Sequence, residues 1–369
     1  MANLKHRLKL GLRDGLARLF AYTPLGALAT RLAPPRLLIL FGHCVDDTRY
    51  DGVLAPDMCL SRKRFGEVLD ALAKKGATFE TIAGGWDRLR GSAPPRSLVA
   101  VSMDDGYRDN AETMTPLLAE RGIPATVFLE TRALDERRVN WTHHLHWLFD
   151  ELGGVDASRA LAERARALGD DEPAGPALAA AVDEALGLVD RGGGDAYYHV
   201  KRRLKYDVDP YLRDELLRGL FTDSGGDEAA LCEHLYMTWD QARAMSDAGI
   251  ELGGHTVSHA ILSTLDEAGQ AAEVSDSLDA IERGLGQRPR TFAYPFGRRW
   301  DYDARTVEAV RAAGCDLAVN THAGTNTKDA PPHELRRVAV EESTPLHLVL
   351  AEACGGFLLL ERLGLSLSE

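Results

Sequence analysis

The sequence predicts an α/β fold, a distorted (β/α) barrel that is interrupted by a helical insertion. Three observations favour this fold class. Short apolar runs alternate with segments of helical spacing, which is typical of a parallel sheet with crossover helices. Polar residues follow two of these runs, at the strand ends where α/β folds place their chemistry. Between the two halves of this pattern, residues 145–235 show helical spacing without a clear strand.

The first part of the barrel is predicted over residues 34–144. Apolar runs bounded by turn residues indicate buried strands, and an N-cap residue such as Ser61 indicates the start of a helix. The predicted elements are a strand at 37–43, a helix at 61–75, a strand at 97–103, a helix at 109–121 and a strand at 125–130.

The second part of the barrel is predicted over residues 236–345. Thr238 and Gln241 have the spacing of a capping box that opens a helix, and Thr264 is the expected start of another helix. Residues 346–369 are predicted to form a C-terminal helix that is broken at Gly355 and Gly356. Strands are predicted at 250–253, 291–294, 316–319 and 337–340, with helices at 238–249, 264–284 and 303–313.

The insertion at 145–235 is rich in Ala, Leu, Arg, Asp and Glu. A loop is predicted at 191–194, where Arg-Gly-Gly-Gly separates two helical pieces. Two interpretations of the insertion stay open at this point. It is either a cap that shapes a substrate pocket or an addition without a role at the site.

Charge and cysteine content narrow the classes of function. The net charge is −13 and no basic stripe with interleaved aromatic residues occurs, which argues against nucleic acid as a partner. The five cysteines are scattered without a Cys-x-x-Cys pair, so neither a disulfide framework nor a thiolate metal site is predicted. Reduced thiols are therefore expected, and they favour the cytosol.

Residues 1–33 form a basic amphipathic segment. Leu4, Leu8, Leu12 and Leu16 recur at helical spacing, and basic residues surround them. Three interpretations stand beside one another: a helix on an anionic membrane surface, a helix packed on the body of the protein, and a signal peptide. Pro24 and similar interruptions of the apolar run disfavour export. We expect a cytoplasmic protein with peripheral contact to the inner membrane as an option.

Two fragments carry the chemistry of the chain. Ser102-Met103-Asp104-Asp105-Gly106 places two adjacent carboxylates after an apolar run, and His255-Thr256-Val257-Ser258-His259 places two imidazoles four residues apart. On a helix or a tight helical turn, both imidazoles project to one face. Two imidazoles and one carboxylate suit Zn²⁺ or a similar divalent ion with a position left for water, from which the second carboxylate can take a proton. The sequence therefore predicts a metal hydrolase.

These fragments resemble the motifs of the NodB-type polysaccharide deacetylases, carbohydrate esterase family 4. The resemblance runs from about residue 37 to residue 340, with the insertion inside it. The family's Thr/Ser-Phe-Asp-Asp-Gly motif is matched by residues 102–106, with Met103 in place of Phe, and its His-Ser/Thr-x-x-His motif by residues 255–259. Its third motif is matched in part by residues 292–297, Phe-Ala-Tyr-Pro-Phe-Gly.

The resemblance implies roles for individual residues. Asp105, His255 and His259 are implied to hold the metal, with zinc as the default. Asp104 is implied to be the general base that deprotonates the attacking water. A main-chain N–H near Phe296 is implied to complete the oxyanion site.

The chain also departs from the family's commonest pattern. Ala293 stands where that pattern has an arginine that orients the base, and Arg337 is the candidate to replace it. The usual Leu-x-His motif that supplies the general acid is missing near the C-terminus. A branch that includes poly-N-acetylglucosamine deacetylases uses an early strand-end histidine instead, which corresponds to His43 here. His347 is the alternative acid.

Aromatic residues near the motifs are candidates for contact with a sugar ring. Trp141 and Trp300 are predicted in loops beside the motif segments, and Tyr294 belongs to the third motif. Packing in the core is the competing interpretation for the two tryptophans. Four further polar residues are interpreted as solvated loop residues and not as ligands; these are Asp46, Asp47, His143 and His144.

The predicted function is metal-dependent hydrolysis of N-acetyl groups on amino sugars of a polysaccharide or its lipid-linked precursor, as in exopolysaccharide biosynthesis. Two alternatives keep the same site and change the substrate, to a cyclic amide or to an O-acetyl ester. A third alternative is a carbohydrate-binding protein that has lost catalysis.

Overall fold

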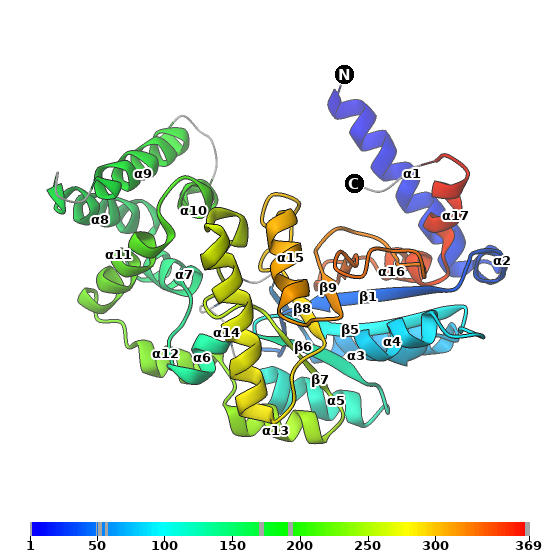
Figure 1. Ribbon diagram of the computed structural model, residues 1–369. Helices are drawn as coiled ribbons and strands as arrows, with labels where there is room; N and C mark the ends of the chain where they lie inside the picture. The colour runs from blue at the N-terminus through cyan, green and yellow to red at the C-terminus, as the bar shows by residue number, and fades with distance from the viewer. Residues whose placement is uncertain are drawn as a thin grey trace.

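The computed structural model describes residues 2–48, 50, 54–55, 58–169, 173–190 and 195–365, with the main chain alone for residues 2–8. Its centre is a parallel sheet in the order β10–β1–β5–β6–β7–β8–β9, with β4 also paired to β5. Helices surround this curved sheet (Figure 1), which confirms the predicted distorted barrel. The strands are β1 (Arg36–Gly42), β4 (Thr78–Glu80), β5 (Ser97–Met103), β6 (Ala125–Leu129), β7 (Glu251–Gly254), β8 (Thr291–Ala293), β9 (Leu317–Val319) and β10 (Val338–Ala339).

The register of β1 and β5 sets the position of the site. The two strands pair from Arg36 opposite Ser97 to Gly42 opposite Met103, and the Asp104 N–H donates to the Gly42 carbonyl at 3.0 Å. Apolar residues fill both faces of these strands, as expected for a parallel sheet covered by helices. The residues that follow β1 and β5 therefore emerge side by side at the carboxyl edge of the sheet.

The helices of the barrel follow most of the expected ranges. Ser61 caps α3 by accepting from the Arg64 N–H at 3.1 Å, and the capping box of Thr238 and Gln241 opens α13. The predicted start at Thr264 is wrong, because Asp266 caps α14 and Thr264 lies in a short 3₁₀ turn. The barrel helices are α3 (Arg62–Lys74), α4 (Ile82–Leu89), α5 (Thr115–Ala119), α6 (Thr131–Asp135), α13 (Trp239–Asp247), α14 (Glu267–Leu285) and α15 (Ala304–Ala312).

The insertion is helical and has an apolar core of its own. Its helices are α7 (Trp141–Leu152), α8 (Gly154–Arg166), α9 (Ala174–Asp190), α10 (Ala196–Tyr206), α11 (Pro210–Asp223) and α12 (Glu228–Leu235). Phe221 is fully buried in this core, and Ile261 of the barrel joins the same cluster. The insertion thus packs against the segment that follows His259. The loop predicted at 191–194 lies outside the described residues.

The N-terminal and C-terminal helices pack together at the end of the sheet that lies away from the insertion. The N-terminal helices α1 (Ala2–Tyr22) and α2 (Pro24–Leu32) pack against the C-terminal helices α16 (Leu346–Ala353) and α17 (Gly356–Arg362) (Figure 1). The prediction of one broken C-terminal helix is confirmed up to Arg362, and residues 366–369 lie outside the described residues. None of the described helices is long and apolar enough to cross a membrane.

The prediction that all cysteines are reduced is wrong for one pair. Cys44 in β2 (Cys44–Val45) and Cys59 in β3 (Cys59–Leu60) form a disulfide, with their Cα atoms 4.8 Å apart. The two short strands pair in parallel with these residues directly opposite each other. The separation of 15 residues in the sequence gives no sign of this disulfide, because it depends on the pairing of the two short strands.

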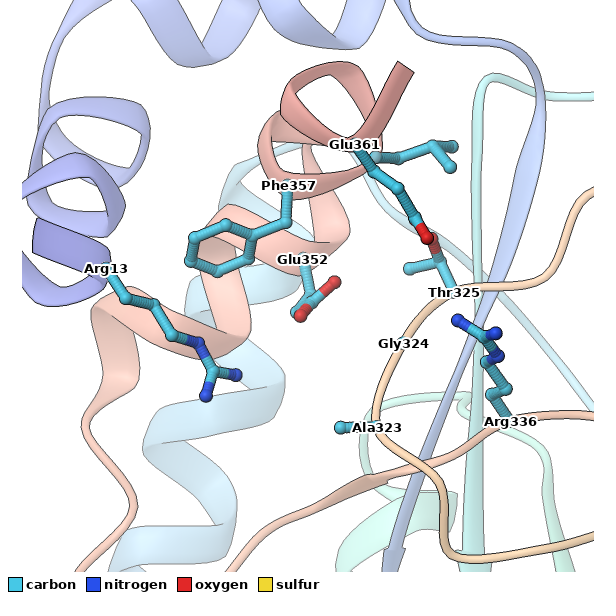
Figure 2. A pocket seen from close by; sticks show the side chains of 9 residues that line it. Arg13, Ala323, Gly324, Thr325, Arg336, Glu352, Phe357 and Glu361 are labelled. Atoms are coloured by element: carbon cyan, nitrogen blue, oxygen red, sulfur yellow. The ribbon is translucent and has the colours of Figure 1, made fainter. Parts of the chain in front are cut away.

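A small cavity between α1, α17 and the loop at residues 323–325 encloses an acidic side chain. Figure 2 shows the Glu352 carboxylate in this cavity, with Arg13, Arg336 and Glu361 among its lining residues. Burial raises the pKa of Glu352 to about 7. The folded protein therefore holds the proton at pH values where the unfolded chain, with a pKa near 4.5, has released it.

We predict that Glu352→Gln stabilises the protein at alkaline pH. The wild-type protein loses stability as pH rises from the unfolded pKa to the folded pKa of about 7, by about 3 kcal/mol in total, and the amide removes this dependence. Denaturant unfolding at pH 5 and pH 8 checks the prediction, with the exposed Glu120→Gln as control. Equal pH dependence in all three proteins would contradict it.

Candidate metal centre and active site

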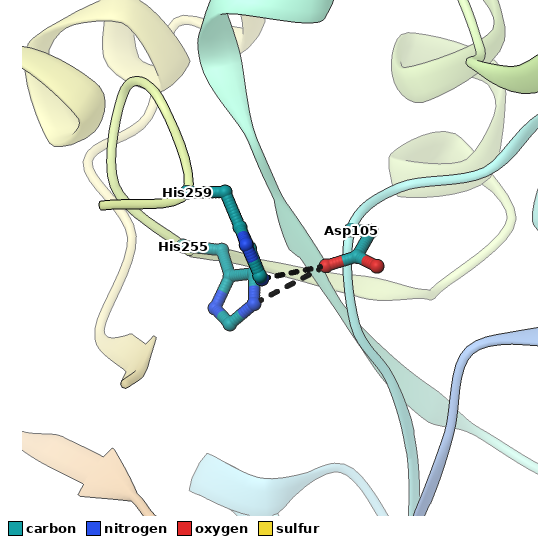
Figure 3. Close-up of side chains that lie close together, drawn as sticks. All are labelled: Asp105, His255 and His259. Carbon is teal, nitrogen blue, oxygen red and sulfur yellow. Dashed lines mark ion pairs between the residues drawn. The ribbon is translucent and has the colours of Figure 1, made fainter. Parts of the chain in front are cut away.

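The structure brings Asp105, His255 and His259 together in a buried cluster. Asp105 Oδ1 lies 3.3 Å from His255 Nε2 and 3.4 Å from His259 Nε2 (Figure 3). One ligand atom from each residue lies within 4.8 Å of the others. Asp105 follows β5 and His255 follows β7, so both arrive at the carboxyl edge of the sheet.

The histidine pair sits on a loop and not on a helical turn, so that part of the prediction is wrong. Thr256 and His259 adopt left-handed conformations with φ of +66° and +56°, and Asp105 does so with φ of +71°. Such residues persist at functional sites where their surroundings hold them. Here Glu273 of α14 accepts hydrogen bonds from the Val257 and Ser258 N–H groups at 2.9 and 3.0 Å. This loop brings the two imidazoles to one carboxylate.

The donor set fits a divalent metal ion. His255 Nδ1 lies 2.7 Å from the Ala293 carbonyl, which assigns the proton to Nδ1 and leaves Nε2 free to face Asp105. Asp105 Oδ1 is buried and has no hydrogen-bond partner among the described residues. A buried carboxylate oxygen that faces the Nε2 atoms of two imidazoles matches the ligands of an open zinc-type site.

Arg337 holds the second carboxylate. Its guanidinium donates to both oxygens of Asp104, at 2.6 and 2.8 Å, and its Nε donates to the Asn320 carbonyl at 2.9 Å. Burial alone would raise the pKa of Asp104, but the charges of Arg337 and His255 and the Arg337 hydrogen bonds lower it overall. Arg337 thus keeps Asp104 ionised and oriented. The third motif cannot do so, because it has Ala293 at the position of the usual arginine.

The two candidates for the general acid lie in different places. His43 directly follows Gly42, whose carbonyl accepts from the Asp104 N–H at 3.0 Å, and the His43 carbonyl accepts from Asn110 Nδ2 at 3.0 Å. His347 Nε2 lies 2.5 Å from Asp14 Oδ1 of α1. His347 therefore belongs to the contact between α16 and α1, and His43 is the histidine beside the carboxylates.

A buried polar chain, which the sequence did not reveal, leads away from Asp105. The Tyr107 hydroxyl lies 3.3 Å from His143 Nε2, and burial together with the nearby Asp105 carboxylate raises the pKa of Tyr107. The same nitrogen lies 3.0 Å from the Tyr236 hydroxyl, which donates to Glu130 at 2.9 Å. Burial lowers the pKa of His143 to about 3 and raises that of Glu130 to about 8. This chain fixes one side of the Asp105 carboxylate.

The interpretation of the four extra polar residues as solvated is wrong for three of them. His143 and His144 are buried on α7, and Asp46 is buried and accepts from Thr113 Oγ1 at 3.1 Å. Only Asp47 has an exposed side chain. The sequence around His143 and His144 gave no sign of their burial, because the residues that cover them are distant in the sequence.

The aromatic candidates differ in their access to a substrate. Phe296 is half-buried, has φ of +59° and packs its ring 4.7 Å from that of His259. Tyr294 is 1% exposed and donates to the His333 carbonyl at 2.9 Å, so its side chain faces the core and not a substrate. Trp141 lies in α7 and not in a loop, and is likewise 1% exposed. Trp300 remains 51% exposed beside the site loop.

Three residues join the insertion to the loop of Phe296, and we call them the insertion clamp; they are Lys205 and Tyr206 of α10 and Asp301 of the barrel. Lys205 Nζ lies 2.9 Å from Asp301 Oδ1 and 3.6 Å from the centre of the Phe296 ring. The Tyr206 hydroxyl donates to the same oxygen at 2.7 Å, and Asp301 Oδ2 accepts from the Arg298 N–H at 2.9 Å. The clamp therefore fixes the loop of Phe296 to α10.

Comparison with known proteins agrees with the motifs. Residues 218–318 match the polysaccharide deacetylase family model, a range that includes the histidine pair and ends before Arg337. A curated relative named as a polysaccharide deacetylase, YxkH of Bacillus subtilis (strain 168), is 30% identical over 105 residues, which are 28% of this chain. The match spans 37% of that relative's length.

Two solved structures share the fold over most of the chain. The Streptococcus pyogenes deacetylase PplD, in complex with acetate, has a TM-score of 0.54 at 16% identity and covers 87% of this chain and 99% of its own. IcaB from Ammonifex degensii has a TM-score of 0.51 at 20% identity and covers 87% of this chain and 97% of its own. At 16% and 20% identity, the similarity to these two structures shows a shared fold alone.

We predict that Asp301→Ala increases the mobility of both segments that Asp301 joins, α10 and the loop of Phe296. The substitution leaves Lys205 without its carboxylate partner and should cost about 3 kcal/mol of stability. Hydrogen exchange should then accelerate in α10 and in residues 296–300 together. The surface-paired Asp316→Ala serves as control. Faster exchange in the loop alone, with α10 unchanged, would show that the clamp does not hold the insertion.

Proposed function

Because the chain carries a polysaccharide deacetylase domain of the NodB type, we propose that it is a metal-dependent N-deacetylase. Its proposed substrates are N-acetylated amino sugars of a polysaccharide or of its lipid-linked precursor, as in exopolysaccharide biosynthesis. One observation carries the proposal. Arg337 keeps Asp104 ionised directly beside the donor set of Asp105, His255 and His259.

Asp104 is the proposed general base. A divalent ion, zinc by preference, bound at Asp105, His255 and His259 would polarise the acetamide carbonyl and make the attacking water more acidic. Asp104 takes the proton of that water, and the paired hydrogen bonds from Arg337 keep its carboxylate in place. An ionised carboxylate is required for this role, and the lowered pKa of Asp104 provides it.

His43 and Phe296 are proposed to serve the later part of the reaction. His43 gives a proton to the departing amine, for which its place beside Asp104 and Asp105 is suited. The Phe296 main-chain N–H has no acceptor among the described residues and is the proposed donor to the oxyanion. The exposed Trp300 is the proposed platform for a sugar ring.

The test is acetate release from N-acetylglucosamine oligomers and from O-acetylated sugars, with zinc restored and with zinc chelated. We expect metal-dependent release from the N-acetyl substrates. Asp104→Asn should lower kcat about 100-fold or more while the bound metal stays unchanged, because the general base is lost. Arg337→Lys should also lower kcat, because one ammonium cannot replace the paired hydrogen bonds.

The exposed Asp47→Asn is the matched control and should keep the full rate. Release from O-acetylated sugars alone would identify an esterase that uses the same site. An Asp104→Asn variant with wild-type kcat would contradict the assignment of the base. A protein that binds sugars and releases no acetate with metal bound would support the carbohydrate-binding alternative.

A further inference from the structure

Exposed apolar side chains concentrate on the N-terminal helices. Of the 14 large hydrophobic residues exposed in the described part of the chain, seven lie between residues 10 and 32. Such a concentration marks an interaction surface and not the scattered exposure that is normal for a globular protein. We call six of these residues the N-terminal apolar face; they are Leu12, Leu19, Tyr22, Leu25, Leu28 and Leu32, whereas Leu10, two residues before Leu12, projects from another side of α1.

The inner sides of both helices are already occupied by the protein. Gly26 of α2 approaches α1 so closely that a Cβ atom there would lie 2.0 Å from the Phe20 carbonyl oxygen. Ala29 is buried on the same side of α2, and α1 packs on α16. Leu25, Leu28 and Leu32 follow at helical spacing on the adjacent, outward side of α2, where they are 47%, 50% and 64% exposed. The apolar face therefore points outward from a fixed support.

The segment that carries this face is basic in composition. Residues 1–33 contain six Lys and Arg residues and one Asp, a net charge of +5 in a chain whose total is −13. Arg31 is exposed on α2 itself. Two further cations come from the body of the protein: Lys75 Nζ donates to the Ala21 carbonyl at 2.6 Å, and Arg96 Nη1 donates to the Ala33 carbonyl at 3.3 Å.

Charge decides which partner fits the face. The acidic residue of the segment, Asp14, is paired with Arg18 at 2.8 Å and contacts His347. A second copy docked face to face would bring two positively charged surfaces together. We propose that the N-terminal apolar face docks on an anionic phospholipid surface, with its leucines in the headgroup boundary and its basic residues on the lipid phosphates.

The fold also sets the direction in which the active site points. Helix α2 ends at Leu32, and β1 starts four residues later at Arg36 and runs to Gly42, next to His43. The lipid-binding face thus lies at the amino end of β1, and the metal donors lie at the carboxyl edge, about 23 Å away at 3.3 Å per residue. Figure 1 shows the N-terminal helices and the insertion at opposite ends of the molecule. Docked in this way, the protein presents its site away from the bilayer, toward polymer in solution.

Co-sedimentation with vesicles tests the proposal. The probes are vesicles of phosphatidylcholine alone and of phosphatidylcholine with phosphatidylglycerol. We expect the full chain to bind the anionic vesicles at least 10-fold more tightly and to be released by salt. Leu25→Glu with Leu28→Glu should lower this binding at least 10-fold, because it places two negative charges on the face. The control is Tyr211→Glu, which changes an exposed aromatic residue of the insertion and should bind as wild type.

Two further readouts separate the outcomes. Acetate release from a soluble oligomer should be unchanged in the double variant and in wild-type protein saturated with vesicles, since the site faces away from the lipid. Inhibition of acetate release by vesicles would contradict the proposed orientation, in which the active site faces away from the bilayer. Equal sedimentation of the double variant and the wild-type protein would show that the N-terminal apolar face is not the lipid-binding surface. A concentration-dependent dimer that the double variant abolishes would assign the face to self-association instead.

Discussion

The buried pair of Arg337 and Asp104 is the interaction on which the site depends. Both side chains are almost completely buried, and moving two charges out of water costs several kcal/mol per ion unless the geometry compensates. The compensation here is complete for Asp104, whose two oxygens each accept from one nitrogen of the guanidinium. Because Arg337 directly precedes β10 and β10 pairs with β1, the sheet order itself delivers the arginine to the end of β5.

The proposed metal donors and the proposed base come from one edge of the sheet, but a different structural feature orients each of them. A left-handed main chain aims Asp105 and His259, a main-chain carbonyl of β8 orients His255, and an arginine orients Asp104. The insertion adds a further layer by holding the Phe296 loop through Asp301. A segment that is only helical in the sequence therefore contributes to the geometry of the site.

Sequence patterns pointed to the candidate site residues more readily than to the residues that hold them in place. The Asp-Asp and His-x-x-x-His fragments are recognisable because their residue types suit one another, and the alternation of apolar runs placed them at strand ends. Arg337 was only a candidate, since no local spacing connects it to Asp104. Lys205, Asp301 and the buried chain through His143 were missed because their partners are distant in the sequence. The contact of Ala293 with His255 uses a carbonyl oxygen, which no side-chain motif can reveal.

Calorimetric titration of metal-stripped protein with Zn²⁺ tests the central claim most directly. The account predicts one high-affinity ion per chain, a loss of affinity of about 10-fold or more in His259→Gln, and undiminished affinity in Arg337→Lys, because Arg337 serves the base and not the metal. Zinc binding that survives His259→Gln unchanged, or that is absent from the wild-type protein, would contradict the assignment of Asp105, His255 and His259 as the metal site.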